Sequence, residues 1–205
     1  MATMGRPRQF DRDEALQKAM SLFWRYGYES TSLAQLKLAM GGISAASLYA
    51  AFGSKESLYK EAVNLYLATS GGEVREALSN PDLDPIEAIT LALRSAVKEQ
   101  AGGSHPRGCM VVLSATNCSP ENEHIQEAME KERKRTRLAF RHCLQRGIEV
   151  GAFHPETDTD SLSAFFSTIL NGISIQARDG FTQTELNKVI DVALSSLLAQ
   201  LEPTI

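Results

Sequence analysis

Residues 41–59 read GGISAASLYAAFGSKESLY and predict a short helix between two turns. Ser44 is typical of a helix N-cap, while Ile43 before it and Leu48 in the first turn can form a hydrophobic staple that fixes the entry of the chain. The glycine pair at 41–42 is typical of the end of a preceding helix. The predicted helix therefore follows Ser44, carries almost no charge, and is followed at Ser54 by a further helix.

Two more helices are predicted upstream. Residues 10–30, FDRDEALQKAMSLFWRYGYES, open with Asp11 as N-cap in a capping-box pattern, repeat apolar residues at helical spacing and close at Gly27. Residues 30–42, STSLAQLKLAMGG, begin a second helix with Ser32 as its cap. The first 60 residues are therefore expected to be helices joined by tight turns.

Two short helices joined by a glycine turn, after a longer first helix, form a helix-turn-helix module. Its third helix would enter the major groove of DNA, which is wide enough for an α-helix. Ala45, Leu48 and Phe52 fall on one stripe and are expected to face the core of the module. The residues expected to point outward are Ser44, Ala46, Ser47, Tyr49 and Ala50. These small side chains allow close approach to DNA, and the Tyr49 hydroxyl can reach a phosphate.

Lys55 follows in the first turn of the next helix, where free backbone N–H groups and the helix dipole already favour an anion. The anion expected there is a phosphate of the DNA backbone. A helix-turn-helix pattern is weak on its own, because a helical hairpin with no DNA-binding role can have the same spacing.

The run LYAAFGSKESL at residues 48–58, with the segments before it, closely resembles the TetR family of bacterial transcriptional regulators. A second stretch, residues 146–178, looks like that family's last helices, so the resemblance covers nearly the whole chain. It implies a homodimer that binds a near-palindromic operator and releases it when a ligand enters the C-terminal domain. Two positions depart from the family pattern: Gly41-Gly42 looks like a one-residue insertion in the turn, and Lys37 stands where a small alanine is common.

The outward face of the predicted third helix contains no Arg, Asn or Gln, the side chains best suited to bidentate base contacts. Specificity is therefore expected to depend on thymine-methyl contacts from the alanines, on Ser47 and on DNA shape. The N-terminal arm GRPRQF would add basic side chains in the minor groove, with a solvated basic tail as the alternative. The full set expected to contact DNA is Arg6, Arg8, Ser32, Lys37, Ser44, Ala46, Ser47, Tyr49, Ala50 and Lys55.

Composition places the chain among ordinary globular proteins. It has 205 residues, 43% of them hydrophobic and 22% charged, and a formal net charge of −4. Residues 1–60 hold eight Lys and Arg against five Asp and Glu, while the remainder holds thirteen against twenty. No apolar run reaches the roughly 18 residues that a membrane span needs, and three cysteines fit a reducing compartment. We expect a cytoplasmic protein with a basic module at residues 1–53 and an acidic body at residues 54–205.

The body is also predicted to be helical, giving an all-α chain of about nine helices. Long helices are expected at residues 85–100, 121–150, 157–178 and 182–201. The segment RGCMVVLSATN, residues 107–117, is apolar and β-branched enough for a strand, but its helical neighbours favour a short buried helix.

The last two helices carry apolar stripes wider than one small domain needs on one side. Pairing them with a second copy would form a four-helix interface, as the resemblance also implies. The alternative is ordinary core. The residues assigned to this interface are Leu162, Phe166, Ile169, Ile173, Ile190, Leu194 and Leu197.

An effector site is expected around residues 105–118 and the helices facing them. Apolar side chains with a few polar anchors are typical of small-molecule sites, although each residue could equally be core. The residues assigned to this site are Cys109, Met110, Phe140, Phe165, Asn171 and Arg178.

Cys109 allows an alternative interpretation, a regulator that senses oxidants or electrophiles through a thiol. It follows Arg107 near a predicted helix start, where the cation and the dipole would lower the pKa of its thiol. The opposing interpretation is an inert buried cysteine. A metal site formed by His105, Cys109, Cys118 and His124 is disfavoured, because these residues lack a recognised ligand spacing.

Catalysis is not expected, because no phosphate-binding glycine loop, nucleophile elbow or paired-carboxylate pattern is present. No cofactor is expected either. The run EKERKRTR at residues 130–137 is expected to be a solvated helix face. An architectural protein that binds any DNA is the remaining rival, but it would not need a large acidic body.

Overall fold

The computed structural model describes residues 11–199 and 201, and in these residues it contains ten α-helices and no strand. The all-α prediction is therefore confirmed. The helices are α1 (Arg12–Ser30), α2 (Leu33–Ala39), α3 (Ala45–Phe52), α4 (Lys55–Ala68), α5 (Glu73–Ser79), α6 (Pro85–Gln100), α7 (Met110–Leu113), α8 (Glu123–Glu149), α9 (Thr159–Arg178) and α10 (Gln183–Leu198), with a 3₁₀ turn η1 (Pro120–Asn122).

Side-chain caps explain where most helices begin. The Asp11 carboxylate accepts bonds from the first turn of α1, and the Ser44 hydroxyl accepts from the backbone N–H of Ser47 at the start of α3. Ser32 forms a complete capping box in α2, and Thr182 forms another in α10. These caps satisfy backbone donors that would otherwise lack partners.

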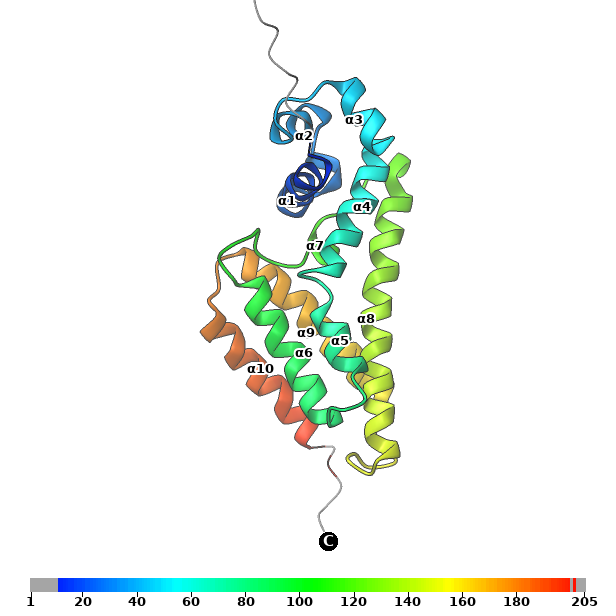
Figure 1. Ribbon diagram of the computed structural model, residues 1–205. Helices are drawn as coiled ribbons and strands as arrows, with labels where there is room; N and C mark the ends of the chain where they lie inside the picture. The colour runs from blue at the N-terminus through cyan, green and yellow to red at the C-terminus, as the bar shows by residue number, and fades with distance from the viewer. Residues whose placement is uncertain (1–10, 200, 202–205) are drawn as a thin grey trace, which may run out of the picture.

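The helices pack around two hydrophobic cores (Figure 1). The first core lies within the N-terminal module and is formed by α1–α4, α7 and the start of α8. The second core lies within the body and is formed by α5, α6, α8, α9 and α10. The helix α8 runs along one side of the molecule and contributes to both cores. Because α4 packs mainly against α1, the first core extends past residue 53.

The structure differs from the sequence expectations at three places. The short helix α5 follows Gly72 directly, which brings the number of α-helices in the described residues to ten instead of about nine. Gly27 breaks α1 with φ of 83°, but the chain resumes for one more turn to Ser30. Ala45 is exposed, so the core-facing stripe of α3 consists of Leu48 and Phe52.

Across the described residues, none of the helices combines the length and the apolar character needed to span a membrane. The short buried helix expected within residues 107–117 is present as α7.

Candidate DNA-binding surface and ligand cavity

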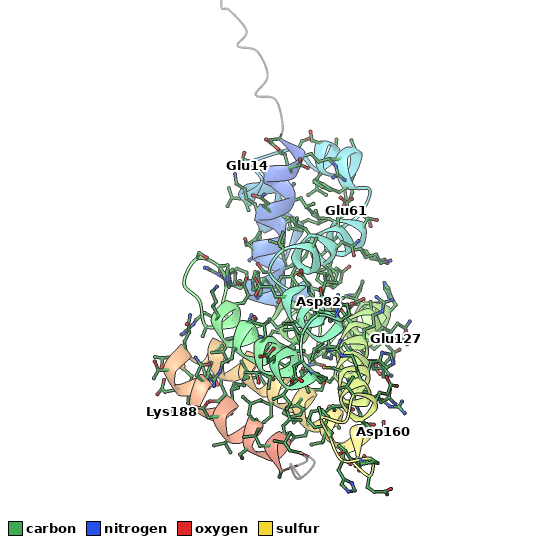
Figure 2. All side chains as sticks on the ribbon, turned by 60° about the horizontal axis from the view of Figure 1, so that its bottom comes forward. Glu14, Glu61, Asp82, Glu127, Asp160 and Lys188 are labelled. Atoms are coloured by element: carbon green, nitrogen blue, oxygen red, sulfur yellow. The ribbon has the colours of Figure 1, made fainter. Side chains whose placement is uncertain are left out.

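Arg12, at the start of α1, holds the end of α3 in place. Its guanidinium donates to both carboxylate oxygens of Glu61 at 2.8 and 2.7 Å and to the Ala51 carbonyl at 3.3 Å. It also lies 4.5 Å from the centre of the Phe52 ring. Figure 2 shows Glu61 on this N-terminal module. Arg12 thus links the end of α3 to α1 and α4, in addition to the packing of the buried Leu48 and Phe52.

The face of α3 that points away from this support is exposed and small. Its exposed residues include all those predicted to face outward: Ser44, Ala46, Ser47, Tyr49 and Ala50. The Tyr49 side chain is 45% exposed, and the Ser44 and Ser47 hydroxyls lie 2.9 Å apart. This face can approach a flat or grooved partner closely, and it offers three hydroxyl groups for hydrogen bonds.

Two left-handed glycines form the turn that leads into α3. Gly41 has φ of 89° and Gly42 has φ of 76°, a region that only glycine adopts at no steric cost. A Cβ at either position would meet no atom within 4 Å. The backbone conformation of the turn, and not crowding, therefore requires glycine here.

Lys55 does not reach outward as the sequence suggested. Its ammonium lies 4.3 Å from the centre of the Tyr28 ring, and burial lowers the pKa of this lysine. The position in the first turn of α4 is as predicted, but the charge is held against α1 by a cation–π contact.

The remaining residues assigned to DNA lie around this face. Ser32 is exposed at the start of α2, where its hydroxyl serves as the helix cap, and Lys37 is half-buried in the last turn of α2. Arg6 and Arg8 lie outside the described residues.

The N-terminal module is joined to the body around Trp24 in α1. The Trp24 indole N–H donates to the Gly108 carbonyl at 2.8 Å, and its ring stacks on His105 at 4.6 Å and meets Tyr66 edge-on at 4.7 Å. The Trp24 carbonyl accepts a bond of 2.7 Å from Arg178 in α9. Trp24 thus contacts α4 and the loop before α7 through its buried side chain, and the end of α9 through its backbone carbonyl.

Ser114, directly after α7, forms a second joint. Its carbonyl accepts the backbone N–H of Tyr28 at 2.7 Å, and its hydroxyl lies 2.5 Å from the Tyr59 hydroxyl. The segment 108–114 therefore contacts the N-terminal module at both of its ends.

The body contains a cavity of about 690 Å³, counting all the space between its lining atoms and its opening. It lies between α4, α5, α6, α7, α8 and α9, and its lining is mixed apolar and polar, as in many small-molecule sites. The apolar lining comes from Leu67, Val74, Ala96, Val111, Val112 and Leu170. The polar lining comes from Tyr66, Ser70, Glu73, Arg75, Ser95, Glu99, Gln100, Cys109, Glu132, Arg133, Thr136, Ser167 and Asn171.

The charged groups of this cavity are mostly paired within the protein. Arg75 donates to the Glu132 carboxylate at 2.9 Å, Arg133 donates to the Val111 carbonyl at 2.9 Å, and Glu99 lies 3.0 Å from His105. A ligand is therefore offered an apolar space edged with hydroxyl and amide groups. The lining also includes Arg133, whose partner is an uncharged carbonyl, and Glu73.

Cys109 lies on the cavity wall, where its sulfur accepts a hydrogen bond of 3.3 Å from the Tyr66 hydroxyl. Burial raises the pKa of its thiol, and the Arg107 guanidinium is bound to the Ala101 and Phe181 carbonyls. The prediction of a thiolate activated by Arg107 and the helix dipole is therefore wrong. The physical reason is that desolvation disfavours the thiolate more strongly than the Tyr66 hydroxyl, the Val111 and Val112 N–H groups and the Arg133 guanidinium favour it.

Of the six residues that the sequence assigned to the effector site, Cys109 and Asn171 line the cavity. Met110 is fully buried in the first core, and Phe140 is fully buried in the second, where it stacks on Phe166. Phe165 is exposed on α9, and Arg178 is bound to the Trp24 carbonyl. These four residues do not line the cavity.

Several lining residues had not been anticipated. Glu132, Arg133 and Thr136 belong to the segment 130–137, which was expected to be fully solvated but turns one edge toward the cavity. The helical spacing of residues 132, 133 and 136 was the available signal, because these positions share one face of a helix.

The residues assigned to a dimer interface lie mainly in the core of the body. Phe166, Ile173, Ile190 and Leu197 are buried, while Leu162, Ile169 and Leu194 are partly buried against them. Other apolar side chains of α9 and α10 are nevertheless exposed: Phe165, Ile175, Val189, Val192 and Leu198. The sequence could not separate these two sets, because the apolar stripe on each helix is wide enough to face both the core and the surface.

In the part of the chain that the structure describes, no three His, Cys, Asp or Glu side chains gather in a way that could hold a metal ion. His105 pairs with Glu99, whereas His124 lies 3.2 Å from Glu56 in α4.

Comparisons with known proteins cover both parts of the chain. A family model described as bacterial regulatory proteins, tetR family, matches residues 15–62, and one described as the tetracyclin repressor-like C-terminal domain matches residues 83–192. The HTH-type transcriptional repressor ComR of Escherichia coli (strain K12) is 31% identical over 193 residues, which cover 94% of this chain and 90% of ComR. The uncharacterized HTH-type transcriptional regulator YezE of Bacillus subtilis (strain 168) is also 31% identical, over 195 residues. The match covers 95% of this chain and 100% of YezE.

A solved structure of a cysteine mutant of the TetR family transcriptional regulator CifR, complexed with 26-bp double-strand operator DNA, superposes with a TM-score of 0.86. It is 43% identical in sequence, and the match covers 93% of this chain and 98% of the CifR chain.

Proposed function

The chain belongs to the TetR family of DNA-binding transcriptional regulators, and from this premise we propose that it is a repressor. We propose that it binds a near-palindromic operator as a homodimer. It would release the operator when a small-molecule effector fills the cavity. Its partners would be operator DNA, a second copy of the chain and the effector. A protein with these partners acts beside the chromosome, in the bacterial cytoplasm. The relatives are transcriptional regulators, a class that is generally non-enzymatic.

The observation that carries this proposal is the exposed face of α3, which is small, hydroxyl-bearing and held on a rigid support by Arg12. A helix in the major groove reads the edges of the base pairs, and short side chains let its backbone come close to them. Ala46 and Ala50 can contact thymine methyl groups, and Tyr49 can reach a phosphate oxygen.

Repression is supported by the name of ComR, which is a transcriptional repressor. Homodimer formation is supported by the exposed apolar set on α9 and α10, since two such faces packed together form a four-helix interface. In a dimer the two α3 helices would lie about one helical turn of DNA, or a multiple of it, apart.

Release by an effector is supported by the position of the cavity. Its lining includes Tyr66 and Cys109, and Tyr66 and Gly108 both contact Trp24 in α1. A ligand that moves either residue acts on the helix that supports α3. Such a ligand shifts the population toward a spacing that no longer fits the operator.

The experiment is a fluorescence-anisotropy titration of reduced protein with DNA flanking its own gene and with scrambled DNA of the same length. Selective binding that Tyr49→Phe weakens about fivefold to tenfold, the value of one phosphate hydrogen bond, supports the proposal. Tyr26→Phe is the matched control, because Tyr26 is equally exposed on α1 but lies outside α3. Equal affinity for both DNAs would instead favour a general architectural protein.

A further inference from the structure

A second hollow, separate from the cavity, lies where α1, the loop before α7 and the end of α9 meet. It encloses about 610 Å³ including its open side, and the residues that line it are Arg25, His105, Pro106, Arg107 and Arg178. We call it the arginine hollow. Within the described residues, its lining includes three arginines and a histidine but no Asp or Glu.

The guanidinium groups of the arginine hollow are positioned by uncharged partners. Arg107 donates to the Ala101 carbonyl at 3.3 Å and to the Phe181 carbonyl at 2.9 Å, and Arg178 donates to the Trp24 carbonyl at 2.7 Å. Among the described residues, the Arg25 side chain forms no hydrogen bond or ion pair. Carbonyl oxygens orient these groups without neutralising their charge.

His105 also lines the arginine hollow and is held between two acceptors. Its Nδ1 lies 3.0 Å from the Pro106 carbonyl and its Nε2 lies 3.0 Å from a carboxylate oxygen of Glu99. The ring also stacks on Trp24. Glu99 lines the cavity on the other side of His105 and does not line the arginine hollow.

Like charges around a partly enclosed hollow repel one another, and an anion between them removes that repulsion. Arginine presents a planar fork of donors that matches carboxylate and phosphate oxygens. We propose that the arginine hollow binds a small anion with at least two negative charges, of the carboxylate or phosphate class.

This site is distinct from the DNA surface and from the effector cavity. Arg12 contacts the end of α3, whereas Arg25 lies thirteen residues further along α1, roughly 20 Å away along the helix axis. The residues that line the arginine hollow do not line the cavity.

Occupancy of the arginine hollow links the two parts of the molecule. Arg25 belongs to α1 in the N-terminal module, while Arg107 and Arg178 belong to the body. An anion that binds all three holds α1 in one position relative to the body, and therefore changes the affinity for DNA. The same region already connects α1 to the loop before α7 through the hydrogen bond from the Trp24 indole to the Gly108 carbonyl.

Trp24 provides a direct readout, because it is the one tryptophan of the chain and it contacts both His105 and Arg178. Purified full-length protein is titrated with citrate, and separately with inorganic phosphate, at constant ionic strength while tryptophan emission is followed. We expect saturable binding of at least one probe, weakened about tenfold by Arg25→Gln, the value of one charge-assisted hydrogen bond. Arg141→Gln is the matched control, because Arg141 pairs with Asp160 at the far end of α8.

Citrate binding without phosphate binding would identify a carboxylate site, and the reverse result a phosphate site. The proposal is overturned if neither probe binds with a Kd below about 20 mM, or if Arg25→Gln and Arg178→Gln both bind with unchanged affinity. Circular dichroism of the two variants confirms that they are folded. Since the titration contains no DNA, its failure leaves the proposed repressor function untouched.

Discussion

The backbone N–H of Tyr28 donates to the Ser114 carbonyl at 2.7 Å, and this bond ties the end of α1 to the end of α7. It forms because Gly27 breaks α1 with a φ of 83° and turns the next N–H out of the helix. A break in the supporting helix of the N-terminal module is thereby used as an attachment point for the body.

Replacement of Gly27 tests this attachment. A Cβ at Gly27 would meet the Ser114 carbonyl oxygen at 3.0 Å, in addition to the strain of a left-handed backbone. We expect Gly27→Ala to lower the free energy of unfolding by about 2–3 kcal/mol. The matched control is Gly42→Ala, which has the same backbone strain but open space around it and should cost about 1–2 kcal/mol. Urea unfolding measures both, and equal losses would contradict a tight contact at Ser114.

The Tyr59 hydroxyl should contribute to the same joint. It is buried 2.5 Å from the Ser114 hydroxyl, so Tyr59→Phe leaves a buried polar group with one partner fewer. We expect a loss of about 1–2 kcal/mol in urea unfolding. Tyr26→Phe, at an exposed tyrosine of α1, should change stability by less than about 0.5 kcal/mol. No difference between the two variants would argue that Ser114 finds another partner.

Cys109 should react slowly with alkylating reagents. Burial raises the pKa of its thiol, which keeps the nucleophilic thiolate scarce near neutral pH. With iodoacetamide at pH 7.5, we expect labelling of Cys109 in the folded protein to be at least about tenfold slower than in urea. Peptide mass spectrometry follows the site. Rapid labelling of Cys109 in the folded protein would revive the thiol-sensor interpretation.

Stability should fall at alkaline pH. Burial raises the pKa of Tyr59, Tyr66 and Cys109, and it raises that of Cys143 to about 11. These groups hold their protons more tightly in the folded chain than in the unfolded chain. Their contribution to the stability of the fold is therefore complete at a pH below the unfolded-state pKa, which is 9.0 for cysteine and 10.0 for tyrosine. It is lost as the pH rises through the pKa of the folded state. Lys55 acts in the opposite direction, because burial lowers its pKa.

The measurement is urea unfolding at pH 8 and at pH 10.5. We expect a lower free energy of unfolding at the higher pH, and a smaller decrease in Tyr66→Phe, which lacks one of the titrating groups. A stability that rises over this range would mean that Lys55 outweighs the tyrosines and cysteines.

The exposed apolar set on α9 and α10 should hold the dimer. Val192 is 73% exposed, so Val192→Asp places a charge on this face without disturbing the core. We expect the variant to sediment as a folded monomer at concentrations where the parent is a dimer, because a buried unpaired charge costs several kcal/mol. Thr184→Asp adds the same charge at an exposed position near the start of α10 and should remain dimeric. A dimeric Val192→Asp protein would place the interface elsewhere.

Figure 2 shows where these substitutions lie. Lys188, between Thr184 and Val192 in sequence, is on α10 at the edge of the body opposite α8.

The N-terminal module could be predicted closely because its signals are local. Ser32 and Ser44 cap the helices that they were expected to cap, each through a residue three positions away, and the next helix begins directly after Ser54. The glycine turn and the outward face of α3 follow from spacing within the same twenty residues. The orientation of Lys55 could not be predicted in this way, because Tyr28 is distant in sequence.

The cavity could not be predicted in detail because it depends on how distant helices meet. Phe140 and Glu132 lie on the same helix, yet one is in the core and the other lines the cavity. Helical period shows that a residue is on an apolar or polar face, but not which neighbour covers that face. The same limit explains why Ile190 was assigned to the interface and is buried, while Val192, two positions later, is exposed.

The short side chains on α3 have a consequence for how sharply the protein can respond. A long arginine can bend to follow a base when its helix moves, whereas the methyl group of Ala46 or Ala50 has no reach to compensate. In the proposed complex with DNA, a displacement of an ångström or two, smaller than an arginine side chain, would open a gap at each of these methyl contacts at once. We therefore expect a slight movement of α1 to cause an abrupt loss of DNA affinity rather than a gradual one.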